Sequence, residues 1–175
     1  MSLKNFRLIQ IAPCTTGGGK WRVLASFDRE IGELLPRCNA LLERAAYDPV
    51  NNTLTTRCYG RPVILGPGQV VIGQLPDPGL AEDILEALMD FLNRVIKQRD
   101  TITPLYEPKL DSTCREIYRL LPRTNCGACR EGTCMAFAFS LWRGERLPEH
   151  CPALSADGLA GVNALLEKMQ DPLLP

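Results

Sequence analysis

Four cysteines in the last third of the chain carry the clearest chemical signature in the sequence. They follow the pattern Cys-x2-Cys-x4-Cys-x16-Cys and are Cys126, Cys129, Cys134 and Cys151. Four thiolates are the complete ligand set of a cubane iron–sulfur cluster or of a tetrahedral zinc ion. Zinc sites most often contain two Cys-x2-Cys pairs, whereas this pattern has one pair and two single cysteines, which favours a cluster. Zinc, and disulfides or unliganded thiols, are the alternatives that the spacing leaves open.

Local features of the sequence explain how these thiols could meet at one centre. Gly127 lets the backbone fold closely between the first two cysteines, and Gly132 lets the loop turn back. Cys134 is predicted at the start of a helix, where free N–H groups and the helix dipole lower a thiol pKa. Gly144 ends that helix, and the turn after it returns the chain to Cys151. Apolar residues of the helix are expected to limit the access of water: Phe137, Phe139, Leu141 and Trp142.

The same stretch resembles a known four-cysteine domain. The run from Thr124-Asn-Cys126-Gly-Ala-Cys129 to Cys151-Pro152-x-Leu154 is similar to the [4Fe-4S] domain of corrinoid iron–sulfur protein large (gamma) subunits. Those subunits belong to acetyl-CoA decarbonylase/synthase systems, and the B subunits of Rnf-type membrane complexes contain the same domain. The resemblance covers roughly residues 111–155. It implies that the four cysteines bind one [4Fe-4S] cluster.

The resemblance does not extend to the rest of those proteins. The sequence predicts neither the cobamide-binding barrel of the corrinoid subunit nor the membrane helix of the Rnf subunit. Corrinoid reduction and Rnf electron flow are therefore not carried over. The first hundred residues or so resemble a domain that accompanies this module in stand-alone proteins of anaerobes, which implies a place in anaerobic metabolism.

Other reactive residues have simpler interpretations. Cys38 and Cys114 lie on apolar helix faces and are predicted to be core residues, while Cys14 and Cys58 lie in or beside strands. For Cys14 and Cys58 a second thiol site is the alternative. His150, the single histidine, is expected to be exposed, with a hydrogen bond to the cluster as the alternative. Four arginines around the motif are expected to be solvated, with stabilisation of an anionic cluster or docking of an acidic redox partner as the alternatives: Arg123, Arg130, Arg143 and Arg146.

An α+β fold is predicted ahead of the cysteine motif. Strands are expected over residues 6–11, 21–27, 53–59, 62–65 and 69–72, with a hairpin turn at 49–52 after Tyr47-Asp48. A helix capped by Asp28 is expected over 29–44, kinked or shortened by Pro36, and a second helix over 80–97. The order of two strands, a helix, three strands and a helix predicts an antiparallel meander sheet covered on one face by both helices.

The remainder of the chain is predicted to be helical. Helices are expected from Asp111 or Ser112 to Leu121, over 134–143, and over 155–169, with a cysteine-rich loop at 123–133. The domains are therefore expected to be 1–99, of unknown role, and 111–175, which binds the cluster. Residues 100–110 have two prolines and no hydrophobic period, and they are predicted to form a linker.

The composition of the chain argues against some classes of function and favours others. Equal numbers of basic and acidic residues, 20 each, and a 6% aromatic content argue against nucleic-acid binding. No apolar stretch is long enough to insert in a membrane, and clustered free thiols are typical of the reducing cytoplasm. The sequence predicts low-potential electron transfer to or from a partner protein, corrinoid-linked or ferredoxin-like, and favours an electron-transfer or accessory protein over an enzyme. The alternative is a protein-interaction module stabilised by zinc or by a non-redox cluster. The oligomeric state is not predicted.

Overall fold

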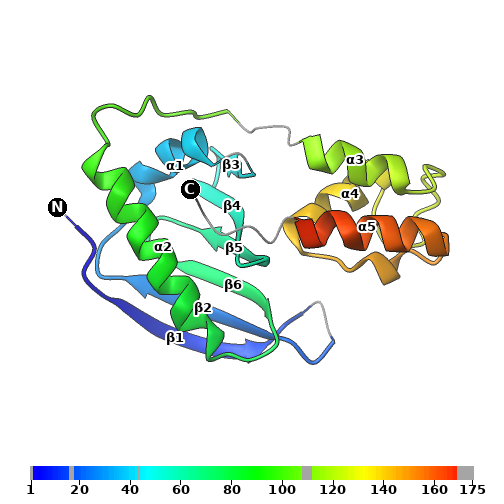
Figure 1. The fold of residues 1–175 in the computed structure, drawn as a ribbon, viewed down its shortest axis with the longest axis horizontal. Coiled ribbons are helices and arrows are strands. Elements are labelled where there is room, and N and C mark those ends of the chain that lie inside the picture. The colour runs from blue at the N-terminus through cyan, green and yellow to red at the C-terminus, as the bar shows by residue number, and fades with distance from the viewer. Residues whose placement is uncertain (1, 16–17, 43, 108–111, 169–175) are drawn as a thin grey trace. The chain divides into compact units, whose positions relative to one another are not determined.

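The computed structural model describes residues 2–15, 18–42, 44–107 and 112–168. The chain divides into two compact units, Met1–Lys109 and Leu110–Gln170, here called the sheet unit and the helical unit. The sheet unit contains an antiparallel sheet and two α-helices, and the helical unit contains three α-helices (Figure 1). The predicted α+β class is therefore confirmed.

Six strands form the sheet in the order β1-β2-β6-β5-β4-β3, with every neighbouring pair antiparallel. The strands are β1 (Phe6–Pro13), β2 (Trp21–Phe27), β3 (Ala46–Asp48), β4 (Thr53–Cys58), β5 (Arg61–Leu65) and β6 (Val70–Leu75). The predicted hairpin around residues 49–52 joins β3 to β4.

The prediction of a single meander is wrong, because β2 pairs with β6 and not with the strand that follows it in sequence. Four strands, not three, follow the first helix. Burial explains this order. Val23 of β2 lies opposite Ile72 of β6, and both are fully buried, so pairing these strands brings two core side chains together.

The first helix is much shorter than the predicted 29–44. A 3-10 turn, η1 (Gly32–Leu34), leads into α1 (Leu35–Leu41). Pro36 lies in the first turn of the α-helix, where its fixed φ and missing N–H are tolerated. The predicted Asp28 cap is also wrong, since the Asp28 carboxylate accepts hydrogen bonds from the Lys4 amide at 3.2 Å.

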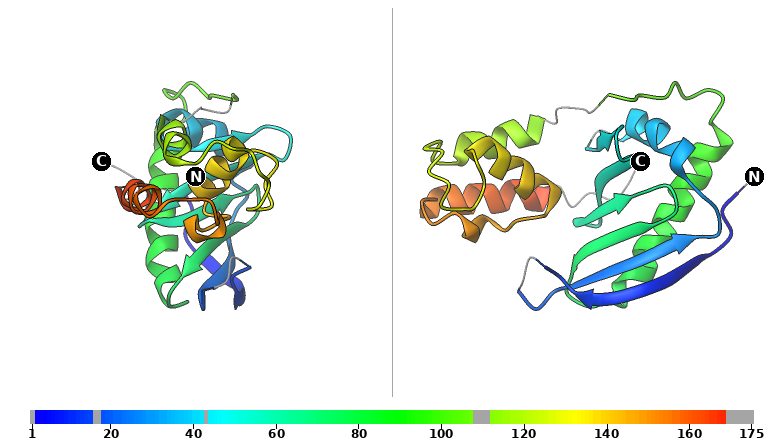
Figure 2. Two further views of the ribbon diagram at one scale, coloured as in Figure 1. Left: turned by 90° about the vertical axis from the view of Figure 1, so that its right-hand side faces the viewer. Right: turned by 180° about the vertical axis from the view of Figure 1, so that it is seen from behind.

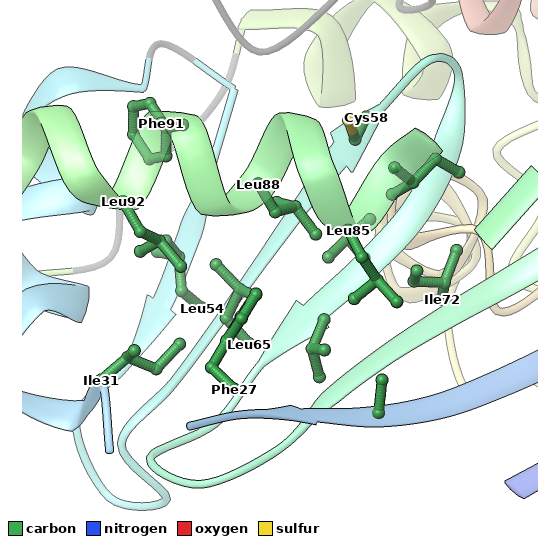
Figure 3. Packing of buried hydrophobic residues seen from close by; sticks show 14 of the residues in the cluster. Phe27, Ile31, Leu54, Cys58, Leu65, Ile72, Leu85, Leu88, Phe91 and Leu92 are labelled. Carbon is green, nitrogen blue, oxygen red and sulfur yellow. The ribbon is translucent and has the colours of Figure 1, made fainter. Parts of the chain in front are cut away.

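The second helix, α2 (Leu80–Lys97), has the predicted bounds and lies across one face of the sheet (Figure 1). Its apolar side chains meet those of the strands in one continuous core (Figure 3). Leu85, Leu88 and Leu92 are fully buried there, as i, i+3 and i+7 positions of one helix face. The alternation of buried residues along β4 shows that the sheet has one covered face.

The segment after α2 is held against α1. The Leu105 amide donates to the Pro36 carbonyl at 2.9 Å, and the fully buried Asn39 donates its side-chain N–H groups to the carbonyls of Leu105 and Glu107, both at 2.9 Å. The expected linker at 100–110 is therefore bound to the sheet unit at Leu105 and Glu107.

Both edges of the sheet are irregular. The pairing register of β1 with β2 shifts between Leu8 and Gln10, which leaves Ile9 in a bulge. Ile9 and Ile11 are 45% and 47% exposed. At the opposite edge β3 has only three residues.

The helical unit contains α3 (Ser112–Leu120), α4 (Cys134–Arg143), a 3-10 helix η2 (Pro148–His150) and α5 (Ala156–Lys168) (Figure 2). Helix α3 packs against both α4 and α5. The approach to α5 is close, because a Cβ atom on Gly158 would lie 3.0 Å from the Leu120 carbonyl oxygen. The expected ends at Asp111 and Met169 lie outside the described residues. No helix in the described part of the chain combines the length and the apolar character needed to cross a bilayer.

Candidate metal centre

The loop that carries the first two cysteines ends in a well-defined helix start. Thr133 has extended backbone geometry and its hydroxyl accepts a hydrogen bond from the Ala136 amide at 3.1 Å, which makes it the N-cap of α4. Cys134 is the first residue of that helix, as predicted. At the other end Gly144 has φ +75°, so it is the predicted left-handed terminator.

Asn125 links the two halves of the motif. Its side-chain oxygen accepts a hydrogen bond from the Cys134 amide at 2.8 Å, which ties the residue before the first cysteine to the third. Its φ of +50° is left-handed, a conformation that asparagine tolerates better than most residues. Sequence reasoning missed this role. The sequence feature that could have indicated it is an asparagine directly before a cysteine and a glycine.

The four thiols differ sharply in exposure. Cys129, Cys134 and Cys151 are buried, with 9%, 7% and 8% of their surface exposed. Cys126 is exposed, and so are its neighbours from Arg123 to Ala128. In α4 the side chains of Phe137, Leu141 and Trp142 are buried, while that of Phe139 is only partly so.

Electrostatics place the four thiols in one neighbourhood. Burial raises the pKa of the Cys151 thiol, a hydrogen bond from the Ala153 amide opposes that rise, and Cys129, Cys126 and Cys134 raise the pKa further. Each of the other three thiols is thus near enough to repel a charge on Cys151. The pKa of Cys126 is lowered instead, chiefly by the Ala128 amide and then by the Thr124 side chain.

The donor set decides what this arrangement can hold. Thiolates are soft ligands that bind iron–sulfur clusters and zinc, and three of these four are shielded from water. The residues therefore fit a group that is ligated by sulfur. Among the described residues, no group of three or more His, Cys, Asp or Glu side chains is spaced to hold a single metal ion.

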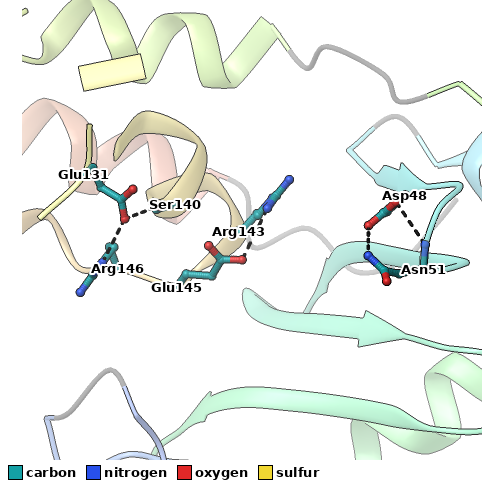
Figure 4. Close-up of polar contacts among 7 residues, drawn as sticks. All are labelled: Asp48, Asn51, Glu131, Ser140, Arg143, Glu145 and Arg146. Atoms are coloured by element: carbon teal, nitrogen blue, oxygen red, sulfur yellow. Dashed lines mark hydrogen bonds and ion pairs between the residues drawn. The ribbon is translucent and has the colours of Figure 1, made fainter. Parts of the chain in front are cut away.

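Charged residues near the motif form two ion pairs. Glu131 accepts hydrogen bonds from Ser140 at 3.1 Å and from Arg146 at 3.3 Å, and Arg143 lies 3.7 Å from Glu145 (Figure 4). These pairs engage two of the four arginines singled out in the sequence. Arg123 and Arg130 form no ion pair within the described part of the chain, and both are exposed.

The remaining candidates lie elsewhere. His150 is half-buried, and its Nδ1 accepts a hydrogen bond from the Leu147 amide at 3.2 Å, so that this nitrogen is used by the backbone of η2. Cys38 and Cys114 are buried core residues, as predicted, and Cys58 is buried as well. Burial raises the pKa of Cys38 to about 12, which keeps this thiol protonated.

Comparison with known proteins agrees with this geometry. A family described as "Putative Fe-S cluster" matches residues 121–153, which span all four cysteines. Residues 121–153 are thus similar to a family of iron–sulfur cluster domains. The iron–sulfur domain covers less than a fifth of the protein, and no solved structure matches the chain.

Relatives share this domain within much longer chains. The gamma subunit of the acetyl-CoA decarbonylase/synthase complex of Methanothermobacter thermautotrophicus is 53% identical over 54 residues, which are 31% of this chain and 12% of that protein. The corresponding subunit of Methanopyrus kandleri is 45% identical over 60 residues, 34% of this chain and 12% of that protein. The corrinoid/iron-sulfur protein large subunit of Moorella thermoacetica is 48% identical over 40 residues, 23% of this chain and 9% of that protein. The similarity thus concerns a small part of each relative.

Proposed function

We propose that Cys126, Cys129, Cys134 and Cys151 bind one [4Fe-4S] cluster, and that the protein carries single electrons to or from a partner protein. The observations that support the proposal are the electrostatic interaction of Cys151 with the other three thiols, the hydrogen bond that ties Asn125 to Cys134, and the position of all four cysteines inside the matched domain. Such a cluster supplies a one-electron couple whose potential depends on burial and on hydrogen bonds to sulfur.

The residues of the chain have separate roles in this proposal. The four thiolates hold the iron, and the Asn125 bond to the Cys134 amide fixes the loop that carries two of them. The Ala128 amide and the Thr124 side chain donate hydrogen bonds toward the Cys126 sulfur, which stabilises it as an anion. Phe137 and Trp142 keep water away from the buried side.

The names of the relatives support a particular kind of partner protein. One of them joins an iron–sulfur centre and a corrinoid in its name, and others are subunits of an acetyl-CoA decarbonylase/synthase complex. We therefore propose a corrinoid-linked or ferredoxin-like partner, in the cytoplasm and in anaerobic metabolism. The sheet unit would then bind the partner or position the cluster.

Iron and sulfide analysis of anaerobically purified protein tests the cluster. We expect about four irons and four sulfides per chain and a paramagnetic resonance signal after reduction. Cys129→Ser should lose the cluster or one of its irons, because a hard oxygen replaces a soft thiolate. Joint replacement of the four scattered cysteines is the matched control and should keep all the iron: Cys14, Cys38, Cys58 and Cys114.

Different results would reject different parts of the proposal. One zinc ion per chain without visible absorption would reject the cluster. Full iron in Cys129→Ser, or loss of iron in the control, would reject the ligand assignment. A cluster that dithionite cannot reduce, or that loses iron in one cycle of reduction and reoxidation, would reject electron transfer alone.

A further inference from the structure

The four cysteines meet solvent very unequally. Cys126 is exposed, whereas the other three have at most 9% of their surface exposed. Electron transfer between proteins requires close approach of the two centres. A cluster held by these ligands would therefore have one sulfur corner that a partner can reach directly.

We propose that electrons enter and leave through the Cys126 corner, and that the surrounding loop docks an acidic surface of the partner protein. This loop, here called the exit loop, comprises residues 123–130. The inference rests on the proposed cluster and adds the site of electron exchange and the charge of the partner.

The exit loop is shaped for close contact. Thr124, Asn125, Gly127 and Ala128 are exposed, and none has a long side chain that would keep a partner at a distance. The loop is also fixed in place. Asn125 is bonded to the Cys134 amide, and the Arg130 amide donates to the Gly127 carbonyl at 2.9 Å.

The charge of the exit loop is positive. Arg123 and Arg130 lie on either side of Cys126, are exposed, and form no ion pair within the described residues. The nearest acid in sequence, Glu131, is engaged by Arg146 and Ser140 (Figure 4). The exit loop thus presents two free guanidinium groups, which attract a partner with a negative surface and speed its encounter.

The electron exchange itself makes and breaks no bond. When the protein acts as donor, the reduced cluster loses one electron and a one-electron centre in the acidic partner gains it. When it acts as acceptor, the same electron moves in the opposite direction. The arginines position the partner and are not electron carriers.

Footprinting of the cluster-loaded protein tests the docking surface, with poly-L-glutamate as the acidic probe. Phenylglyoxal modification of each arginine is followed by mass spectrometry. We expect poly-L-glutamate to protect Arg123 and Arg130 at low salt at least fivefold more than Arg115 and Arg119. The latter are exposed on α3 and serve as internal controls. Equal protection of the two pairs, or none, would overturn the docking surface.

Oxidation rates test the exit point. The dithionite-reduced protein is mixed with ferricyanide, an anion, or with hexaamminecobalt(III), a cation. The quantity measured is the oxidation rate with ferricyanide divided by the oxidation rate with hexaamminecobalt(III). Arg123→Glu/Arg130→Glu should lower this ratio about tenfold at low salt, because four units of charge change beside the exit corner. Arg115→Glu/Arg119→Glu, with the same change in net charge, should leave it within twofold.

The outcomes separate this inference from the proposed function. Iron content and visible spectra establish that each variant holds its cluster. Arg123→Gln/Arg130→Gln is a milder second variant, and we expect about half of the effect in logarithmic terms. If the clusters are intact and the two double reversals change the ratio equally, the exit through Cys126 is wrong while the electron-transfer function stands. Absence of a cluster in the unmodified protein rejects both.

Discussion

Asn125→Ala is the substitution for which the geometry of the metal centre gives the sharpest expectation. It removes the 2.8 Å hydrogen bond to the Cys134 amide, which contributes about 1 kcal/mol. It also places alanine at φ +50°, which costs about 1 kcal/mol more. The exit loop should therefore open more readily by about 2 kcal/mol, which corresponds to about thirtyfold.

Iron release to a ferrous chelator measures this opening. If iron leaves from the opened loop, visible absorbance should decay about thirtyfold faster in Asn125→Ala than in the unmodified protein. Asn125→Asp is the matched control, because aspartate keeps an acceptor for the Cys134 amide and tolerates a left-handed backbone. We expect its rate within about threefold of the original. Equal rates for Asn125→Ala and the unmodified protein would refute the role assigned to this bond.

Three further predictions concern stability. Thr133→Ala should destabilise the helical unit by about 1 kcal/mol through loss of the cap, and Thr133→Ser should not, as measured by urea unfolding with Trp142 fluorescence in a Trp21→Phe background. Gly158→Ala should cost about 2 kcal/mol in the same assay, because its Cβ would lie 3.0 Å from a backbone oxygen. Gly161→Ala should be neutral or stabilising, since it meets only the Leu120 side chain; the reverse order would contradict the packing. The third prediction concerns Cys38, whose pKa is raised from 9.0 to about 12 in the folded chain, so that stability is complete below pH 9 and falls as pH rises from 9 to 12. The loss should be about 1.4 kcal/mol per pH unit relative to Cys38→Ala, and parallel pH profiles of the two proteins would refute it.

Local sequence patterns predicted some helices of the chain correctly and one helix wrongly. Helix α2 has the bounds expected from its apolar spacing, and α4 begins at Cys134 and ends at Arg143, directly before Gly144, as expected. Their signals were local: a repeat of apolar residues for α2, a terminal glycine for α4. The prediction of a helix over 29–44 was wrong for a local reason too, since Pro36 suits the first turn of a helix and α1 begins one residue before it.

The order of the strands was beyond local reasoning. Pairing of β2 with β6 depends on which strands bury the most apolar surface together, and this involves residues almost fifty positions apart, such as Val23 and Ile72. The same holds for Asn39, whose carbonyl partners at Leu105 and Glu107 lie more than sixty residues away. Polar residues of this kind give no periodic signal.

The four cysteines of the proposed site could be singled out in the sequence because they lie close together in the chain. The spacing of the cysteines named four residues, and the structure brings their thiols into one electrostatic neighbourhood. The spacing could not predict which of the four thiols would be exposed and which would be buried. Exposure of Cys126 and burial of Cys151 depend on how the chain folds around α4.

The irregular edges of the sheet bear on whether two copies of the chain can pair through their sheets. Strands with free backbone groups would invite a second copy to extend the sheet, but the bulge at Ile9 interrupts one edge and the three residues of β3 offer little at the other. Ile9 and Ile11 are exposed there, so a regular β1 would be an aggregation-prone edge strand. The bulge thus hinders pairing of a second copy at this edge of the sheet.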